Sequence, residues 1–192
     1  MDFVLFGDDT TSVFSPRYKR MMHKTWKPRI HIHLQSQAQK AIQKKVKGPA
    51  AADLDLWTKS LLYLLSDQNG QMAFKTFLKS EFCEENLEFW LACEEFKCTK
   101  SKDILTSTAI GIYEQFIRTD SPKQINLDFH TRERITQSLQ HPTTSCFVVA
   151  QRKIYHLMEN DAYPRFIQSD FYKELHAAAS KGAKKNHRRV LH

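Results

Sequence analysis

The stretch FLKSEFCEENLEFWLACE, residues 77–94, decides the fold of this 192-residue chain. From Glu84 to Lys97 apolar residues occur on almost every side of a helix, and the largest are Leu87, Phe89 and Trp90. A helix that is apolar all round is buried on all sides. The stretch therefore predicts a helix at the centre of a helical bundle, with Phe89 and Trp90 in the core.

Helical patterns continue on both sides of this stretch, and no alternating strand pattern occurs. Upstream, one helix face collects Leu54, Trp57, Leu61, Leu64 and Leu65, residues 67–70 predict a turn, and Met72–Leu78 predicts a short helix. Downstream, a helix is predicted over 104–117. A second is predicted over 131–140, with Thr131 as its N-cap and Pro142 as its stop. A third is predicted over 146–160, and its core residues are Val149, Ile154, Tyr155 and Met158. Pro164 is predicted to break the chain before two short helical pieces that reach Leu175. The fold class is all-α.

The net charge of +8 comes from the two ends of the chain. Residues 15–50 hold ten Lys and Arg and no acid, and residues 181–192 hold five Lys and Arg and no acid. Residues 51–180 carry a balance of −4. A folded nucleic-acid reader usually carries its positive charge on the domain itself. We therefore expect no nucleic-acid partner, and a nucleic-acid-binding protein with basic arms is only the second hypothesis.

The sequence favours a soluble, cytoplasmic protein. The apolar run Phe3–Phe6 is too short for a secretory leader, and no stretch approaches the roughly 20 apolar residues that span a bilayer. Four cysteines without paired spacings or nearby histidines fit free thiols in a reducing compartment. We expect no metal site.

Motifs of enzymatic chemistry are missing from the sequence. A phosphate-binding GxxxxGK[ST] loop, HExxH and GxSxG do not occur. The acid pairs at 84–85 and 94–95 are adjacent on helices, so their side chains diverge by about 100° and fit a solvated face. A His/Cys nucleophile pair remains open, but nothing specific supports one. This composition favours a binding module over an enzyme.

The start of the helix at Glu84 breaks a local rule. Glu84 and Glu85 place two acids in the first turn, where they complement the helix dipole. Cys83 stands where a Ser, Thr or Asp cap is expected, and a thiol is a weak cap. Such a position is either functional, or Ser80 caps the helix one turn earlier, or the helix start frays. The residues alone leave these alternatives open.

Four motifs in register resemble the regulator of G-protein signalling (RGS) family. They are the stretch 77–94, Ile125-Asn126-Leu127-Asp128, Cys146-Phe147 followed by Ala150-Gln151, and Leu157-Met158-Glu159 through Tyr163-Pro164-Arg165-Phe166. The similarity extends from about Leu54 to Leu175. It implies a small single-domain member with a nine-helix fold, built from a four-helix bundle lobe and a terminal-helix lobe. The implied domain covers 51–179, between a basic arm at 1–50 and a basic tail at 180–192.

The resemblance also implies a function. Members of this family activate the GTPase of heterotrimeric Gα subunits by stabilising the Gα switch regions in the transition state of hydrolysis, which ends signalling by G-protein-coupled receptors. The chain would then be no enzyme and need no cofactor, because GTP and Mg²⁺ are bound by Gα. Three loops at the base of the bundle, 80–86, 121–129 and 157–165, would bind activated Gα. The matching positions are Glu81, Phe82, Cys83, Glu85, Asn86, Asn126, Leu157, Asp161 and Arg165. An α-helical scaffold that binds Gα without accelerating hydrolysis is the third hypothesis.

The resemblance suggests a role for individual residues. Asn126 resembles the asparagine that approaches the Gα glutamine and first switch, and Asn86 is expected near the second switch, with a helix-start cap as its alternative. For Asp161 and Arg165 the alternative is an ion pair that organises their own loop. Cys83 resembles members that prefer q-class Gα, where most have serine. Asp161 departs from that type, which tends to carry asparagine, so q-class activity is expected and i-class activity stays open.

The N-terminal arm has an amphipathic pattern. Tyr18, Met22, Trp26 and Ile30 are spaced by four, and cations lie on the other face. This pattern predicts a helix on an anionic membrane surface at the inner face of the plasma membrane. Pro28 would kink or end such a helix. Calmodulin binding and a disordered polybasic tail are the alternatives. We expect a monomer, and the nucleus is an alternative compartment. The expected membrane-binding residues are Arg17, Arg20, Met22, Lys24, Trp26, Lys27 and Ile30.

Overall fold

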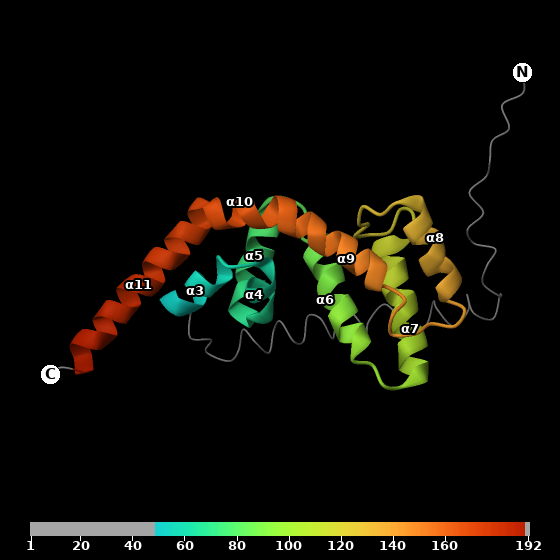
Figure 1. Ribbon diagram of the computed structural model, residues 1–192, viewed down its shortest axis with the longest axis horizontal. Helices are drawn as coiled ribbons and strands as arrows, with labels where there is room; N and C mark the ends of the chain where they lie inside the picture. Colours follow the sequence, from blue (N-terminus) through green and yellow to red (C-terminus); the bar gives the residue numbers. More distant parts are fainter. Residues whose placement is uncertain (1–48, 191–192) are drawn as a thin grey trace, which may run out of the picture. The chain divides into compact units, whose positions relative to one another are not determined.

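The computed structural model describes residues 49–190, with side chains to residue 181. The N-terminal arm and its expected membrane-binding residues lie outside the described residues. Every regular element between residues 49 and 190 is helical, which confirms the all-α prediction (Figure 1). None of these helices combines the length and the apolar character needed to cross a membrane. The elements are α3 (Ala51–Trp57), α4 (Leu61–Ser66), α5 (Gln68–Ser80), α6 (Glu85–Lys97), α7 (Lys102–Ile112), the π-helical segment η2 (Tyr113–Ile117), α8 (Phe129–Ser138), α9 (Val148–Leu157), the π-helical segment η3 (Met158–Ala162), α10 (Tyr163–Gln168) and α11 (Asp170–Val190).

Helix α6 lies at the centre of a bundle, as its sequence predicts. It packs against α7 and α9, and the fully buried ring of Phe89 meets Phe116 of η2 edge-on, with 5.7 Å between ring centroids. Phe147, just before α9, contacts the ring of Phe89, and the centroids of the Phe147 and Phe96 rings are 5.1 Å apart. The core prediction for Trp90 is wrong, because neighbouring helix residues diverge by about 100°. Its ring is half-buried beside Tyr155.

The first and last helices form a second lobe around Phe166. This buried ring of α10 lies 5.3 Å from Phe74 and 5.4 Å from Tyr172 between centroids. The hydroxyl of Tyr172 donates to the carbonyl oxygen of Leu54 at 2.7 Å, and that of Tyr163 donates to Trp57 at 2.8 Å. Both carbonyls belong to the last four residues of α3. The last four carbonyl groups of a helix have no N–H partner within that helix. The two tyrosines therefore tie α10 and α11 to the start of the domain.

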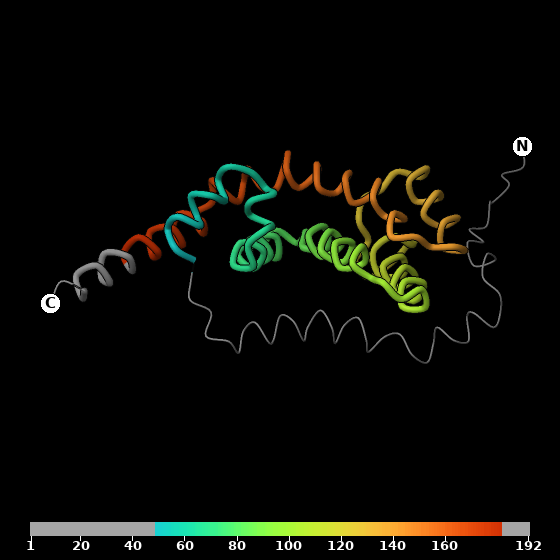
Figure 2. Tube along the Cα trace, turned by 60° about the horizontal axis from the view of Figure 1, so that its bottom comes forward, coloured from blue at the N-terminus to red at the C-terminus, as the bar shows by residue number. Residues whose placement is uncertain are grey.

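The chain runs without a break from α9 through η3 into α10, as the continuous coil in Figure 2 shows. The predicted break at Pro164 is therefore wrong. Across the wide π turn the N–H of Tyr163 donates to Met158, and Pro164 follows in the first turn of α10. Proline is tolerated there because a first-turn N–H has no partner in its own helix. The prediction that the second helical piece after Pro164 is short is also wrong, since α11 is a single long helix from Asp170 to Val190.

Side-chain caps move two predicted helix starts. The Ser60 hydroxyl accepts from the N–H of Tyr63 at 3.3 Å and separates α3 from α4, so the first predicted helix is two. The carboxylate of Asp67 accepts from the N–H of Asn69 at 3.1 Å. Residues 67–70 are thus the capped start of α5 and not a turn.

Two further predicted starts shift near the C-terminal half of the bundle. Asp128, not Thr131, caps α8, and its carboxylate accepts from both the N–H and the hydroxyl of Thr131, at 3.0 and 2.8 Å. Helix α9 begins at Val148, two residues later than predicted, and Val149 is exposed where a core position was predicted. An Asx cap takes precedence over a threonine within the first turn, since its carboxylate is the stronger acceptor.

Gly70 gives a test of the packing between α4 and α5. An added Cβ at this position would lie 2.2 Å from the backbone oxygen of Leu64. We predict that Gly70→Ala lowers the free energy of unfolding by about 1–3 kcal/mol through this clash, where a helical Gly→Ala change usually stabilises by about 1 kcal/mol. Urea unfolding measures the effect, and Gln68→Ala in the same turn, at an exposed position, is the control. An unchanged or higher midpoint for Gly70→Ala would contradict the packing.

Candidate functional site: a rim of three segments

Three segments that are distant in sequence meet along one edge of the domain. They are the turn between α5 and α6, the loop 118–128 between η2 and α8, and the helical run from Leu157 to Arg165. In Figure 1 all three lie at the upper edge, and ion pairs connect the helices beside them. We call these three segments the rim. The rim contains seven of the nine positions that the resemblance assigns to Gα binding, and the other two, Glu85 and Asn86, lie in the first turn of α6 beside it.

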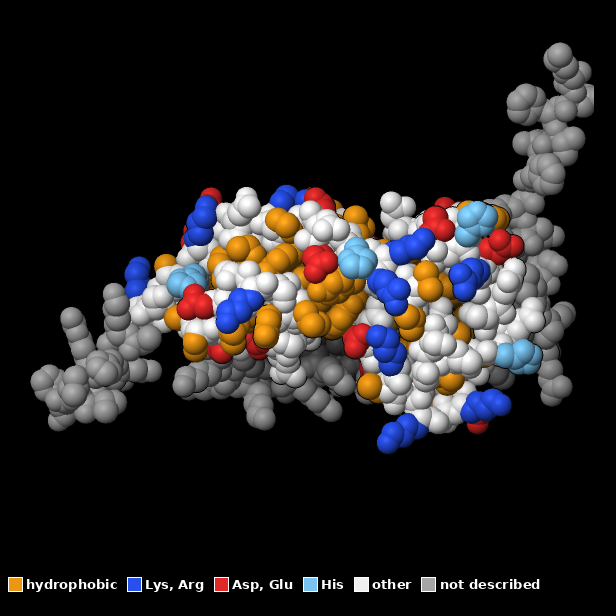
Figure 3. Space-filling view, viewed as in Figure 1, with side chains coloured by type: hydrophobic (Ala, Val, Ile, Leu, Met, Phe, Trp, Pro, Cys, Tyr) orange, Lys and Arg blue, Asp and Glu red, His pale blue; other side chains and the backbone are white. Residues whose placement is uncertain are grey.

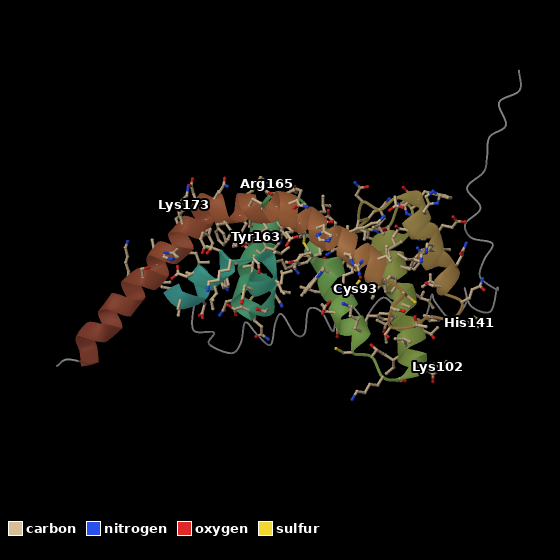
Figure 4. All side chains as sticks on the ribbon, viewed as in Figure 1. Cys93, Lys102, His141, Tyr163, Arg165 and Lys173 are labelled. Atoms are coloured by element: carbon tan, nitrogen blue, oxygen red, sulfur yellow. The ribbon has the colours of Figure 1, made fainter. Side chains whose placement is uncertain are left out.

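Arg165 joins two of these segments. Its guanidinium donates from Nη2 to Glu81 Oε2 at 2.7 Å and from Nε to Glu81 Oε1 at 3.3 Å, and it also pairs with Asp161. These hydrogen bonds, first with Glu81 and then with Asp161, raise the pKa of Arg165 further above its ordinary value. Arg165 lies at the outer edge of α10, while Tyr163 lies further in (Figure 4). The ion pair given as the alternative for Asp161 and Arg165 is therefore present, and it orders the α5–α6 turn.

Phe82 occupies an unusual backbone position in that turn. Helix α5 ends in a Schellman motif, in which the N–H groups of Cys83 and Phe82 donate to Leu78 at 3.0 Å and Lys79 at 3.3 Å. Residue 82 of this motif has a φ of 56°, which usually calls for glycine. Phe82 nevertheless fills it, and its ring is 91% exposed.

Cys83 does not cap α6, and its bonds go to the end of α5 instead. Its Sγ lies 3.7 Å from the carbonyl oxygen of Leu78, and the N-cap of α6 is Glu84, which makes no side-chain cap bond. Ser80 bonds back to Phe77 within α5, so the proposed earlier cap is also wrong. The Schellman motif accounts for this, because Cys83 serves through its backbone N–H. Burial, followed by the charges of Glu81 and Glu85, raises the pKa of the Cys83 thiol to about 11, so the group is a neutral thiol at physiological pH.

Asn86 and Glu85 open α6 beside this turn. The Asn86 amide makes only long hydrogen bonds, to the Cys83 carbonyl at 3.5 Å and to Glu85 Oε1 at 3.4 Å. Burial raises the pKa of the Glu85 carboxyl, and the nearby charges of Glu84 and Glu88 add to the effect. Both side chains are half-buried and retain capacity for an outside partner.

Asn126 projects from a loop whose neighbours are buried. Ile125 and Leu127 point into the core on either side of it, which leaves the Asn126 side chain exposed. Within the described residues its amide has no hydrogen-bond partner. The backbone is fixed nonetheless, because the N–H of Ile125 donates to Phe116 at 2.9 Å and that of Lys123 to Gln115 at 3.1 Å. The loop thus presents a free amide from a fixed backbone.

The third segment is helical where a loop was predicted. Leu157, 41% exposed, ends α9, Asp161 lies in η3 and Arg165 in α10. The other π-helical segment, η2, leads into the loop that carries Asn126. π-helical segments occur frequently at functional sites. Of the two described here, η3 lies in the rim and η2 leads into it.

Sequence reasoning missed the ion pairs beside the rim, of which Glu88–Lys123 and Asp128–Lys153 attach the loop 118–128 to α6 and α9. Glu88 of α6 pairs with Lys75 of α5 at 2.8 Å and with Lys123 of the Asn126 loop. At the base of α8, Asp128 pairs with Lys153 of α9, and hydrogen bonds from Lys153 and Thr131 hold the pKa of Asp128 well below its usual range. No spacing rule connects these residues.

Several features of the rim bear on what it can bind. The part of the chain with described side chains holds no group of three His, Cys, Asp or Glu placed to bind a metal. The Cys83 thiol is protonated, and the carboxylates of Glu81 and Asp161 are already paired. Acids and bases are interspersed between hydrophobic side chains on the face in Figure 3 rather than forming one basic patch. Exposed Phe82 and Leu157, on the same rim as the free amide of Asn126, are typical of an interface.

Known proteins resemble this chain over the same region. The family model described as the regulator of G protein signaling domain matches residues 60–175. Regulator of G-protein signaling 1 from Equus caballus is 45% identical over 168 residues, which cover 88% of this chain and 84% of the relative. Regulator of G-protein signaling 21 from Homo sapiens is 51% identical over 129 residues, 67% of this chain and 84% of the relative. Regulator of G-protein signaling 16 from Sus scrofa is 55% identical over 124 residues, 65% and 62% of the two chains.

The region that the family model matches, residues 60–175, contains the whole rim, from the α5–α6 turn to Arg165, and the helices from α4 to the first turns of α11. The helical fold, the position of the rim and these relatives agree. The chain belongs to the regulator of G-protein signalling family.

Proposed function

We propose that this chain accelerates GTP hydrolysis by activated Gα subunits, by holding their switch segments in the reactive arrangement. The observation that carries the proposal is the rim itself. Arg165 and Glu88 fix three distant segments against one another, while Asn126 and Phe82 on those segments have no partner within the described residues. The ion pairs hold the backbone of the rim in place, while the side chains that could contact another protein have no partner among residues 49–181. This combination fits a preorganised binding site.

The mechanism follows from what a Gα subunit already has. Gα carries its transition-state arginine in cis and a glutamine that orients the attacking water. A partner therefore needs only to bind the switch segments more tightly in the transition state than in the ground state. Raising an intrinsic rate of about 10⁻² s⁻¹ a hundredfold requires about 2.7 kcal/mol. Two or three net hydrogen bonds of about 1 kcal/mol each supply that amount.

Individual contacts follow from the state of each side chain. The Asn126 amide donates and accepts toward the Gα glutamine and first switch, and Asn86 serves the second switch. Leu157 contributes apolar contact. Glu81 and Asp161 act mainly by ordering the rim through Arg165, with their remaining lone pairs available to Gα.

The class of Gα depends on the α5–α6 turn. Cys83 is half-buried at the point where the turn meets α6, so its size and weak hydrogen bonding affect how closely a switch segment approaches. We infer activity on q-class Gα, and i-class Gα is the second candidate. Parallel single-turnover assays on both classes decide between them.

Asn126 provides the direct test. We predict that Asn126→Ala lowers the single-turnover rate constant of Gα-bound GTP hydrolysis at least tenfold, because the only unpaired amide of the described loop is lost. The melting temperature stays unchanged, since the side chain is exposed. Asn69→Ala, at the far end of α5, is the control. Tight binding of wild-type protein to Gα with an unchanged hydrolysis rate would support the scaffold alternative instead.

Phe82 combines two costs that a stable fold would avoid, a φ of 56° and a large exposed ring. Such strain suggests function. We predict that Phe82→Gly stabilises the fold by about 1 kcal/mol, because glycine adopts positive φ freely. Phe82→Ala gives no such gain, and both variants lose Gα activation to a similar extent. Urea unfolding and single-turnover hydrolysis measure these effects. Full activity of the Phe82→Gly variant would show that Phe82 does not contribute to the interface with Gα.

The arm adds a second part to the proposal. We infer that residues 17–30 attach the protein reversibly to anionic lipid at the inner face of the plasma membrane, which would place the rim near membrane-bound Gα. The support is the spacing of Tyr18, Met22, Trp26 and Ile30 opposite a row of cations. Calmodulin is the competing partner of the same segment.

Vesicle sedimentation tests the arm. Replacing Arg17, Arg20, Lys24 and Lys27 with Gln should weaken binding to vesicles with anionic lipid at least a hundredfold, since each cation contributes about 1 kcal/mol. The matched control replaces Lys40, Lys44, Lys45 and Lys47 with Gln. Equal losses in both variants would indicate a polybasic tail without a defined membrane-binding helix.

A further inference from the structure

Glu88 lies where three elements of the domain meet. It belongs to α6, and its side chain is only 13% exposed. Lys75 reaches it from α5 with 2.8 Å between Nζ and Oε1, and Lys123 reaches the other carboxylate oxygen from the loop 118–128. One carboxylate thus links the helices on both sides of the α5–α6 turn to the loop that carries Asn126.

The charge on Glu88 is maintained by these two lysines. Burial alone would raise the pKa of its carboxyl, but hydrogen bonds from Lys123 and Lys75 outweigh burial and hold the pKa below its ordinary value. A mostly buried carboxylate persists only when it is paired in this way. The lysines are 37% and 47% exposed, so each can return to water if Glu88 is replaced.

The other attachments near Asn126 lead to elements other than α6: the side chain of Asp128 pairs with Lys153 of α9, and Arg132 of α8 donates to the carbonyl oxygen of Leu127 at 3.5 Å. The loop's backbone bonds to η2 run from Lys123 to Gln115 and from Ile125 to Phe116, and they fix the loop to the end of η2 only. The Lys123 side chain supplies the connection to α6. Since Asn126 follows Lys123 by three residues, the Lys123–Glu88 ion pair is the direct side-chain connection between the Asn126 loop and α6, next to the α5–α6 turn.

We propose that Glu88 is a positioning residue for Gα activation, which acts through Lys123 to hold Asn126 at a fixed distance from the Arg165-ordered turn. This inference rests on the proposed function. It connects the Asn126 loop to α6, whereas Arg165 connects the α5–α6 turn to α10 and Lys153 connects the end of the loop to α9. A shift of about 1 Å in a contact group is enough to cost a large factor in rate.

Single-turnover assays over a range of chain concentrations test the proposal. We expect Glu88→Gln and Lys123→Met each to lower the saturating rate constant about tenfold, with less than a threefold change in the half-saturating concentration, because the other contacts remain. Lys123→Arg should restore most of the rate. Lys75→Met is the matched control, since it removes the other partner of Glu88 and leaves the loop connected, and it should stay within twofold of wild type.

A double-mutant cycle separates positioning from general stability. In the Asn126→Ala background, Glu88→Gln should cause almost no further loss if it acts through Asn126. Additive losses, or equal losses for Lys75→Met and Lys123→Met, would overturn the proposal. So would an unchanged rate in Glu88→Gln.

Amide hydrogen exchange gives a readout that needs no Gα. The N–H of Ile125, bonded to Phe116, should exchange at least tenfold faster in Glu88→Gln than in wild type or Lys75→Met, with melting temperatures within a few degrees of one another. Wild-type protein that accelerates no Gα would defeat the proposed function. Unchanged exchange at Ile125 would defeat the Glu88 connection by itself.

Discussion

The packing of Phe166 is the constraint on which the rim depends. Its buried ring holds α10 against Phe74 and Phe77 of α5, and the preceding residue, Arg165, is thereby brought to Glu81 at the end of the same helix. Burying a phenylalanine stabilises a fold by about 1.5–3 kcal/mol, whereas an exposed ion pair contributes about 0–1 kcal/mol. Packing in the core therefore brings the segments of the rim together, and the guanidinium of Arg165 then sets the positions of Glu81 and Asp161.

This order of causes divides the rim into two kinds of group. Glu81, Asp161 and Arg165 satisfy one another, so they define a frame that a partner meets already formed. Asn126 and Phe82 are left without partners in the described part of the chain, although the backbone beneath each is fixed by hydrogen bonds. A partner that binds such a surface orders few side chains, and more of the interaction energy is left for discriminating between conformations of the partner.

The sequence correctly predicted the helices that follow from a local apolar pattern. The predictions were wrong where a single capping side chain, or a contact with a residue distant in sequence, determines where a helix begins or ends. The apolar surface of 84–97 correctly placed α6 at the centre. The motifs marked three segments that lie along one edge of the domain, and their role in binding Gα stays a prediction. Pro164 was misread because sequence rules assume an α-helix, and a π turn before it removes the conflict. Asp67 and Gly70 favour a turn, yet the carboxylate caps α5 and the glycine admits the Leu64 carbonyl. The pairs of Glu88 span 13 and 35 residues, and no periodicity could have found them.

The two tyrosine hydroxyls that reach α3 bear on how the protein is made. Tyr163 and Tyr172 bond to residues 106 and 118 positions earlier in the chain, so α3 has no complete set of neighbours until translation has passed them. The bundle around α6, which draws on residues 85–157, can close sooner because its contacts are more local. A nascent chain on the ribosome would therefore expose the apolar side of α3 and α4 for most of its synthesis, and this interval is when it would be most open to chaperones or to aggregation.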